Sequence, residues 1–449
     1  MSAKEPLTGG RQAPAELLLR DVHVLDPRAR IDARHDLLVR GGRIAELGEP
    51  GSLEAGADEE LIEGHGRLRL LPAFFDPHVH LRTPGQEHKE DLETGTRAAA
   101  AGGFGAVIAM PNTDPVLDSA PLLRSLRDAA AREARIPVGF LPAITRGLEG
   151  EQLSEMAELR QEGALGFTDD GKPVRSAGML RKALQYQRLC GGVLALHEED
   201  PTLSRGGSMN EGAVSAALGI AGIPTVAEST MVARDAALAG YEDARVHFQH
   251  LSCAASADAV ADAKARGWRV SAEVCPHHLL LTDEDVRGMD TSMKMHPPLT
   301  TEADRLALIE ALRAGTIDCV ATDHAPHARD EKEVPFEQAP MGSTGLETAF
   351  AALHTSLVLA GVIELALLVE RMTAGAALFE LPTPSIAPGE PANLTLVDLD
   401  ATWVAGEHGW ESRSENCCFA GRQLRGRVLL TVAAGTLAHR DHTLAMVDA

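Results

Sequence analysis

The sequence lacks the features of a secreted or membrane-spanning chain. It contains no run of about 18 apolar residues, the length that a membrane helix needs. The first twenty residues carry Lys4, Glu5, Arg11 and Glu16 and contain no apolar segment of the kind that signal peptides have. We therefore expect neither export nor membrane insertion.

Cysteine is scarce, and basic residues are fewer than acidic ones. The 6 cysteines are scattered without a CxxC pair, which favours a reducing compartment and predicts a cytoplasmic protein. The 42 basic and 65 acidic residues give a formal charge of -23, which repels phosphate backbones and anionic lipid surfaces. Nucleic acid and membranes are therefore not expected partners, and an anionic substrate would need local positive charge.

The middle of the chain has no dinucleotide-binding or P-loop fingerprint, but it alternates apolar β-type runs with helical stretches. The predicted strands cover residues 70–75, 105–110, 136–142, 164–167, 192–196, 245–249, 269–274 and 317–321. Eight βα units of this kind predict an α/β fold of the (β/α)8 TIM-barrel type. An open doubly wound sheet is the alternative, because alternation alone does not report closure.

Both ends of the chain differ from this middle part. Residues 15–70 and the last sixty residues alternate short apolar runs with turns, which is typical of β-strands. At 449 residues the chain also exceeds what one core usually supports. We predict a small β-sandwich domain built from both termini, residues 1–70 and 381–449, beside a catalytic barrel of residues 71–380.

Metal-ligand side chains recur where the predicted barrel strands end. In a TIM barrel these ends share one mouth, so the side chains would converge. The residues are Asp76, His78 and His80 after strand one, Asp169 and Asp170 after strand four, His197 and Glu198 after strand five, His250 after strand six, and Asp323 and His324 after strand eight. Imidazole together with carboxylate favours zinc or a similar divalent ion, and the set is large enough for a binuclear site.

Several motifs resemble the amidohydrolase superfamily and, within it, the dihydroorotase family. The most specific is His78-Val-His-Leu-Arg-Thr-Pro-Gly-Gln-Glu-His-Lys-Glu-Asp91. Further blocks are Met110-Pro-Asn-Thr113, Phe167-Thr-Asp-Asp-Gly171, Glu273-Val-Cys-Pro-His-His278, His296-Pro-Pro-Leu299 and Ala321-Thr-Asp-His-Ala-Pro-His327. This resemblance implies reversible cyclisation of N-carbamoyl-L-aspartate to L-dihydroorotate in pyrimidine biosynthesis.

The resemblance also implies a set of zinc ligands. One ion would be held by His78, His80 and Asp323, the other by His197 and His250, and Asp170 would bridge the two. Two zinc ions per chain are expected, and a single ion is the alternative. Asp169 is the alternative bridge. Most of the superfamily bridges its metals with a carboxylated lysine, but the Thr-Asp-Asp-Gly segment resembles the branch that uses aspartate, which disfavours Lys172.

The same resemblance assigns the catalytic and substrate-binding roles. Divalent cations lower the pKa of a water and polarise an amide carbonyl, and Asp323 would serve as general base. The expected substrate contacts are His80, Arg82, Asn112, His296, His327, Met341 and Gly342. Arg82 would hold the substrate carboxylate through two parallel hydrogen bonds. Supporting roles are expected for His277, His278 and His324.

One departure from the family pattern keeps two alternatives open. Dihydroorotases usually carry asparagine where this chain has His296, so a hydantoinase-like or allantoinase-like cyclic amidohydrolase is one alternative. The other is an inactive homologue that serves as a structural partner of aspartate transcarbamoylase, although such relatives lose metal histidines that are present here. Assembly with that transcarbamoylase is also compatible with activity, and a homodimer is a further expectation.

Overall fold

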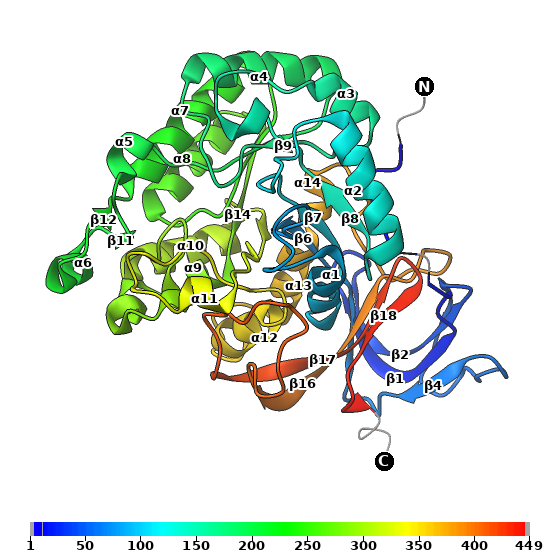
Figure 1. Cartoon of the computed structure of the whole chain (residues 1–449). Helices are drawn as coiled ribbons and strands as arrows, with labels where there is room; N and C mark the ends of the chain where they lie inside the picture. The colour runs from blue at the N-terminus through cyan, green and yellow to red at the C-terminus, as the bar shows by residue number, and fades with distance from the viewer. Residues whose placement is uncertain (1–3, 11, 445–449) are drawn as a thin grey trace.

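A computed structural model describes residues 4–10 and 12–444 of the chain (Figure 1). A barrel occupies the middle of the chain, and a β-sheet domain made from both ends lies beside it. No helix among the described residues is long and apolar enough to cross a membrane.

The β-sheet domain joins the first and last parts of the chain. Its sheet has the order β18-β17-β16-β5-β1-β2-β3, with β4 paired to β1. The strands are β1 (Leu17–Asp26), β2 (Ile31–Arg40), β3 (Arg43–Gly48), β4 (Glu60–Glu63), β5 (Arg69–Pro72), β16 (Leu394–Val404), β17 (Gln423–Ala433) and β18 (Thr436–Arg440). Because β5 and β16 pair in antiparallel register, the two ends form one unit with its own apolar core. The predicted construction from both termini is confirmed.

Eight parallel strands form the barrel. They are β6 (Phe74–Val79), β7 (Phe104–Ala109), β8 (Val138–Phe140), β9 (Phe167–Thr168), β10 (Leu194–Leu196), β13 (Val246–Phe248), β14 (Val270–Val274) and β15 (Cys319–Val320). They pair as β6-β7-β8 and as β9-β10-β13-β14-β15. The amide of Leu165 donates to the carbonyl of Phe140 at 3.1 Å on one side, and Val79 and His324 form a parallel bridge on the other. These contacts close the ring, so the TIM-barrel prediction is confirmed.

Helices cover the outside of this barrel (Figure 1). The longer ones are α1 (Leu92–Ala101), α2 (Ala120–Glu133), α3 (Met156–Gln161), α4 (Ala177–Cys190), α7 (Val226–Glu242), α8 (Ala254–Ala265), α10 (Glu302–Ala314) and α13 (Leu365–Thr373). The shorter ones are α5 (Pro201–Ser204), α6 (Ala213–Leu218), α9 (Pro276–Leu280), α11 (Arg329–Lys332), α12 (Ala349–Leu353) and α14 (Gly375–Leu378). A two-stranded sheet of β11 (Met209–Asn210) and β12 (Gly222–Ile223) lies with α6 at the edge of the molecule.

Local sequence explains how α1 is placed after β6. The carboxylate of Asp91 accepts a 2.8 Å hydrogen bond from the amide of Thr94, which caps the helix. The helix ends at Gly102, and Gly103 follows with a φ of +89°. A Cβ atom at Gly103 would lie 3.0 Å from the ring of Phe74, so only glycine allows this close return to β7.

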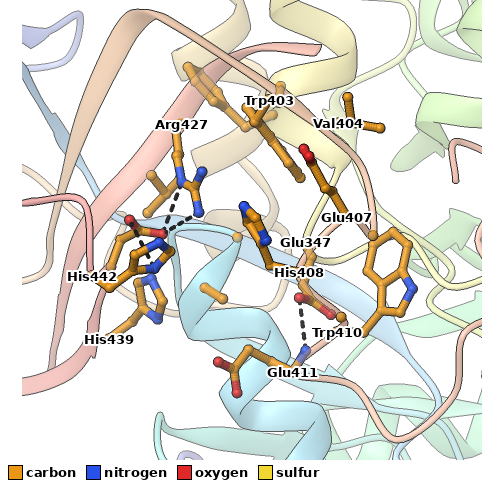
Figure 2. A pocket seen from close by; sticks show the side chains of 18 of the residues that line it. Glu347, Trp403, Val404, Glu407, His408, Trp410, Glu411, Arg427, His439 and His442 are labelled. Atoms are coloured by element: carbon orange, nitrogen blue, oxygen red, sulfur yellow. Dashed lines mark hydrogen bonds and ion pairs between the residues drawn. The ribbon is translucent and has the colours of Figure 1, made fainter. Parts of the chain in front are cut away.

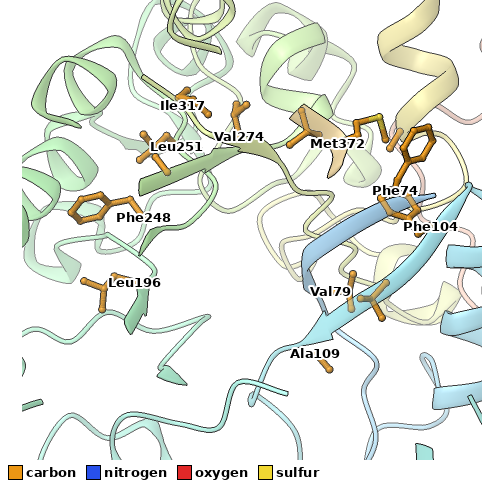
Figure 3. Packing of buried hydrophobic residues seen from close by; sticks show 14 of the residues in the cluster. Phe74, Val79, Phe104, Ala109, Leu196, Phe248, Leu251, Val274, Ile317 and Met372 are labelled. Carbon is orange, nitrogen blue, oxygen red and sulfur yellow. The ribbon is translucent and has the colours of Figure 1, made fainter. Parts of the chain in front are cut away.

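Apolar side chains fill the interior and the space between strands and helices (Figure 3). Phe74 stacks on Phe350 with 5.2 Å between ring centroids and meets Phe104 edge to face at 5.8 Å. Phe248 and Val274 are fully buried on the opposite side of the barrel. This packing makes the strand ends a rigid support for polar side chains.

The first barrel strand differs from its prediction. Residues 70–75 were expected to form one strand, but β5 ends at Pro72 in the outer sheet and β6 begins at Phe74. One continuous apolar run thus serves two sheets, and hydrophobic pattern alone does not reveal where the chain passes between them. As a consequence, His78 lies inside β6 and His80 directly follows it.

Candidate metal centre and substrate pocket

A cavity of about 210 Å³ opens where the barrel strands end. It is lined by His80, Arg82, Asn112, Asp170, Gly171, His197, His250, His296, Asp323, Ala325, His327, Met341 and Gly342. Every residue that the sequence predicted for substrate or metal binding is in this lining except His78, which is fully buried beside it. The structure therefore brings the predicted residues together from segments far apart in the chain.

Asp170 lies at the centre of four histidines. Its Oδ1 atom is 3.4 Å from Nε2 of His78, 3.4 Å from Nε2 of His250 and 3.7 Å from Nδ1 of His197. Its Oδ2 atom is 3.4 Å from Nε2 of His80. Oδ1 thus faces His78, His197 and His250, and Oδ2 faces His80, so this one carboxylate contacts histidines of both predicted ligand groups.

Asp323 approaches the same centre from the end of the eighth strand. Its Oδ1 atom is 3.0 Å from Nε2 of His80 and 3.5 Å from Nε2 of His78. The backbone of Asp323 has a φ of 47°, a conformation that non-glycine residues adopt rarely. Asp323, His78 and His80 form one group of potential ligands, while His78, Asp170 and His250 form another.

The electrostatics of this cluster suit bound cations. Burial favours the neutral form of His78, but the carboxylates of Asp170 and Glu273 outweigh it and raise the pKa of the imidazole well above its usual value. Burial likewise opposes ionisation of Asp170, yet the neighbouring His78 holds the pKa of that carboxyl well below its usual range. The Nε2 atom of His78 is buried without a hydrogen-bond partner, although two carboxylates lie close to it. A divalent cation between these groups would satisfy them, so the donor set fits a metal.

Two carboxylates that the sequence reasoning did not assign support the histidines. Oε1 of Glu273 in β14 is 2.6 Å from Nδ1 of His78. Oε2 of Glu199 forms a short hydrogen bond with Nε2 of His296 and lies 3.8 Å from Nε2 of His197. Glu273 belongs to a motif that carried the family resemblance, which was the available signal. Glu199 follows His197 by two residues and had no signal beyond that proximity.

The adjacent aspartate faces elsewhere. Oδ1 of Asp169 accepts from the amide of Thr145 at 2.9 Å, and Oδ2 accepts from the Thr145 hydroxyl at 2.5 Å. Burial raises the pKa of Asp169 to about 6. Lys172 is exposed. This geometry favours Asp170 over both alternatives as the bridge.

Arg82 and Asn112 line the same cavity as the cluster. Arg82 is buried, and its Nε donates to the carbonyl of Pro326 at 3.1 Å. Burial lowers the pKa of its guanidinium to about 10, so the group stays charged at neutral pH. Oδ1 of Asn112 is 2.8 Å from Nδ1 of His80, which leaves its amide nitrogen for a ligand.

Two of the three histidines expected to play supporting roles, His278 and His324, have hydrogen-bond partners outside the cluster. Nε2 of His278 donates to the carbonyl of Pro297 at 3.0 Å, and the rings of His277 and His278 are 4.4 Å apart. Nε2 of His324 lies 3.2 Å from Oε2 of Glu90, directed away from the cluster. Nε2 of His277 is buried without a hydrogen-bond partner, and the supporting roles expected for these three residues stay predictions.

A larger cavity of about 360 Å³ lies between the barrel and the C-terminal strands (Figure 2). Its walls include Trp403, Trp410 and Arg427, and burial raises the pKa of Glu347 at its base to about 7. None of its lining residues belongs to a group of three potential metal ligands in the described part of the chain. The cavity at the strand ends is therefore the stronger candidate for an active site.

Comparison with known proteins points the same way. A family model described as "Dihydro-orotase-like" matches residues 66–256. A dihydroorotase from Desulforapulum autotrophicum is 44% identical over 421 residues, which cover 94% of this chain and 98% of the relative. A dihydroorotase from Pelotomaculum thermopropionicum is 44% identical over 430 residues, which cover 96% of this chain and 100% of the relative.

Solved structures are similar in fold. An L-hydantoinase (dihydropyrimidinase) from Arthrobacter aurescens superimposes with a TM-score of 0.84 at 24% identity and covers 94% of this chain and 96% of its own. A dihydropyrimidinase from Brevibacillus agri superimposes with a TM-score of 0.80 at 24% identity and covers 95% of each chain. At this identity the likeness establishes the barrel and the accompanying β-domain, and it does not extend to the substrate.

Proposed function

The chain belongs to the dihydroorotase family, and from this we propose that it interconverts N-carbamoyl-L-aspartate and L-dihydroorotate, with release of water on cyclisation, in pyrimidine biosynthesis. The chain is accordingly a metal-dependent cyclic amidohydrolase. The observation that carries the substrate assignment is the single cavity that joins the Asp170 cluster to the buried guanidinium of Arg82. A cyclic amide that carries a carboxylate needs the metal cluster for its amide bond and the guanidinium for its carboxylate, in one cavity.

The proposed cofactor is zinc, with two ions per chain. His78, His80 and Asp323 would hold one ion, His197 and His250 the other, and Asp170 would lie between them. Such ions lower the pKa of a water and polarise an amide carbonyl. Support comes from the near-equal distances of Asp170 to His78, His80 and His250, each 3.4 Å.

Asp323 is proposed as the general base and acid. It is buried, lies 3.0 Å from His80 and lines the cavity. In hydrolysis it would accept a proton from the attacking water and deliver it to the ring nitrogen as the amide C–N bond breaks. In cyclisation the same carboxylate would take the proton from the carbamoyl nitrogen as the N–C bond forms and give it to the departing hydroxide, which leaves as water. One residue would thus serve both directions.

The substrate contacts follow from the remaining lining. Arg82 would bind the substrate carboxylate, with the amide nitrogen of Asn112 and the imidazole of His327 beside it. Met341 and Gly342 would face the ring with their backbone, and His296 would contact it with its imidazole. These roles rest on the shared cavity and on the directions that the hydrogen bonds leave free.

The test is an ultraviolet assay of the zinc-loaded protein in both directions, with dihydrouracil and hydantoin as competing substrates. We expect turnover of dihydroorotate and carbamoyl aspartate only, and its loss in Asp323→Asn with metal content measured in parallel. Preferred turnover of hydantoin or dihydrouracil would contradict the substrate assignment. Metal-loaded protein without any turnover would contradict the activity itself.

The alternatives have less support. A hydantoinase-like enzyme would need a carboxylated lysine near the cluster, and Lys172 is exposed outside it. An inactive homologue is disfavoured because the four histidines and both aspartates are present and converge.

Assembly with aspartate transcarbamoylase and homodimer formation stay predictions. Size-exclusion chromatography of this protein, alone and mixed with the transcarbamoylase, would test them. A cytoplasmic location is proposed on the six cysteines, which are all free.

A further inference from the structure

Two lysines near the substrate pocket are buried without a carboxylate partner. Lys294 is 3% exposed and Lys332 is 7% exposed. Neither forms an ion pair with any carboxylate in the described part of the chain. Burying an unpaired ammonium group is unfavourable, so such groups are retained chiefly where they serve a function.

Backbone carbonyls surround both ammonium groups. Nζ of Lys294 donates to the carbonyls of Phe336 at 2.9 Å, Glu337 at 3.0 Å and Ala339 at 2.8 Å. Nζ of Lys332 donates to the carbonyls of Thr291 at 2.9 Å and Pro340 at 2.8 Å. Four of these five acceptors lie in residues 333–342, which we call the pocket segment.

The pocket segment ends in the lining of the active-site cavity. The carbonyl of Met341 accepts a 2.9 Å hydrogen bond from Nε2 of His327, and the amide of Gly342 donates to the carbonyl of Lys294 at 2.7 Å. Lys294 thus holds the segment through both its side chain and its backbone. His296, two residues after Lys294, lines the same cavity.

The ammonium group of Lys332 also acts on this side of the cavity. Burial, followed by the charges of Arg82 and Lys332, lowers the pKa of His327 to about 2. Lys332 thus adds positive charge where the pocket segment meets the cavity, in a chain whose formal charge is -23.

We infer that Lys294 and Lys332 are positioning residues that hold the pocket segment against the active-site cavity, and that Lys332 adds positive charge to that wall, so that the enzyme selects substrates carrying a carboxylate. The inference rests on the proposed function for its substrate and on the carbonyl contacts for its geometry. It assigns the lysines no contact with the reacting atoms.

The positioning role is tested by hydrogen exchange on the full-length, metal-loaded protein, without reference to activity. Lys294→Met removes three hydrogen bonds, and we expect the amides of residues 333–342 to exchange about tenfold faster, while those of the barrel strands are unchanged. Lys182→Met, at an exposed lysine, is the control. Unchanged exchange of the pocket segment in both Lys294→Met and Lys332→Met would overturn the inference.

The selection role is tested by kinetics with dihydroorotate. Lys332→Met should raise KM about tenfold with kcat changed less than about twofold, because the lost charge acts on binding. Lys332→Arg, which keeps the charge, should restore KM. A KM equal to that of wild type in Lys332→Met would contradict the inference, whereas wild-type protein without dihydroorotate turnover would contradict only the proposed function.

A pH series tests the charge of Lys332 in the wild-type protein and in Lys332→Arg, two proteins that are expected to keep the fold. Burial and then the charge of Lys294 lower the pKa of Lys332 to about 7, against the opposing effects of Asp290, Glu331 and Cys418. As pH rises through about 7, Lys332 loses its charge and KM should rise. Arginine stays protonated, so the KM of Lys332→Arg should stay low over the same range. An identical pH dependence of KM in the two proteins would overturn the inference.

Discussion

The Nδ1 atom of His78 lies 2.6 Å from Oε1 of Glu273, and both side chains are fully buried. Because Glu273 engages one ring nitrogen, the other nitrogen faces Asp170 and Asp323. A carboxylate in this position fixes the orientation of a metal-binding imidazole and increases its basicity. The proposed metal centre therefore depends on a residue outside its own ligand set.

Replacement of Glu273 by glutamine should weaken metal binding. Glutamine keeps the size of the side chain but removes the charge, and loss of such a partner lowers metal affinity about 10- to 100-fold. Competition with a chromophoric chelator measures this affinity directly. Glu284→Gln, which alters an exposed pair with Arg287, is the matched control. Equal affinity in Glu273→Gln and wild type would show that Glu273 does not orient His78.

The neighbouring residues Asp169 and Asp170 should respond in opposite ways to the same substitution. Asp170→Asn should lose bound metal and activity, since Asp170 lies among the histidines. Asp169→Asn should keep its metal but lose about 1 to 3 kcal/mol of stability, because Asp169 holds Thr145 through two hydrogen bonds. Metal content and thermal unfolding of each variant decide this, and loss of metal in Asp169→Asn alone would reverse the assignment.

The convergence of the site could be predicted because barrel topology places strand ends together. His197, His250 and Asp323 were separate signals in the sequence, and closure of the barrel brings all three to one cavity. The motif around His78 added the substrate side, including Arg82. The roles of these residues are still predictions, whereas their proximity is a feature of the structure.

Other features could not be predicted from the sequence pattern. Glu273 and His78 are 195 positions apart, and nothing in an apolar strand indicates which distant histidine a buried carboxylate will meet. The choice between Asp169 and Asp170 also depended on structure, since β9 ends at Thr168 and alternation no longer applies beyond it. The break between β5 and β6 was missed for a similar reason, because one apolar run enters two sheets.

Replacing His296 by asparagine, the residue usual in the family, should tighten substrate binding. Nε2 of His296 is engaged by Glu199, so one ring nitrogen is left for the substrate. Asparagine offers both a donor and an acceptor, and one added hydrogen bond corresponds to a KM lower by about two- to tenfold. Steady-state kinetics of His296→Asn and His296→Ala measure the effect, with a rise in KM expected for the alanine variant. A higher KM in His296→Asn would contradict this prediction and show that the imidazole of His296 binds the substrate better than an amide does.

Arg82 provides the sharpest test of substrate orientation. Its guanidinium is buried, and within residues 4–10 and 12–444 only Nε forms an internal hydrogen bond, to the carbonyl of Pro326. The two terminal nitrogens are then available for a carboxylate in the bidentate geometry that lysine lacks. Arg82→Lys keeps the charge but loses this geometry, so KM for dihydroorotate should rise about 10- to 100-fold.

The control for Arg82 separates charge from geometry. Arg82→Met removes both and should raise KM further than Arg82→Lys does, while metal content stays at the wild-type level because Arg82 holds none of the proposed ligands. If Arg82→Lys retained the wild-type KM, the carboxylate would be bound elsewhere in the cavity, and Asn112 and His327 would be the next residues to substitute.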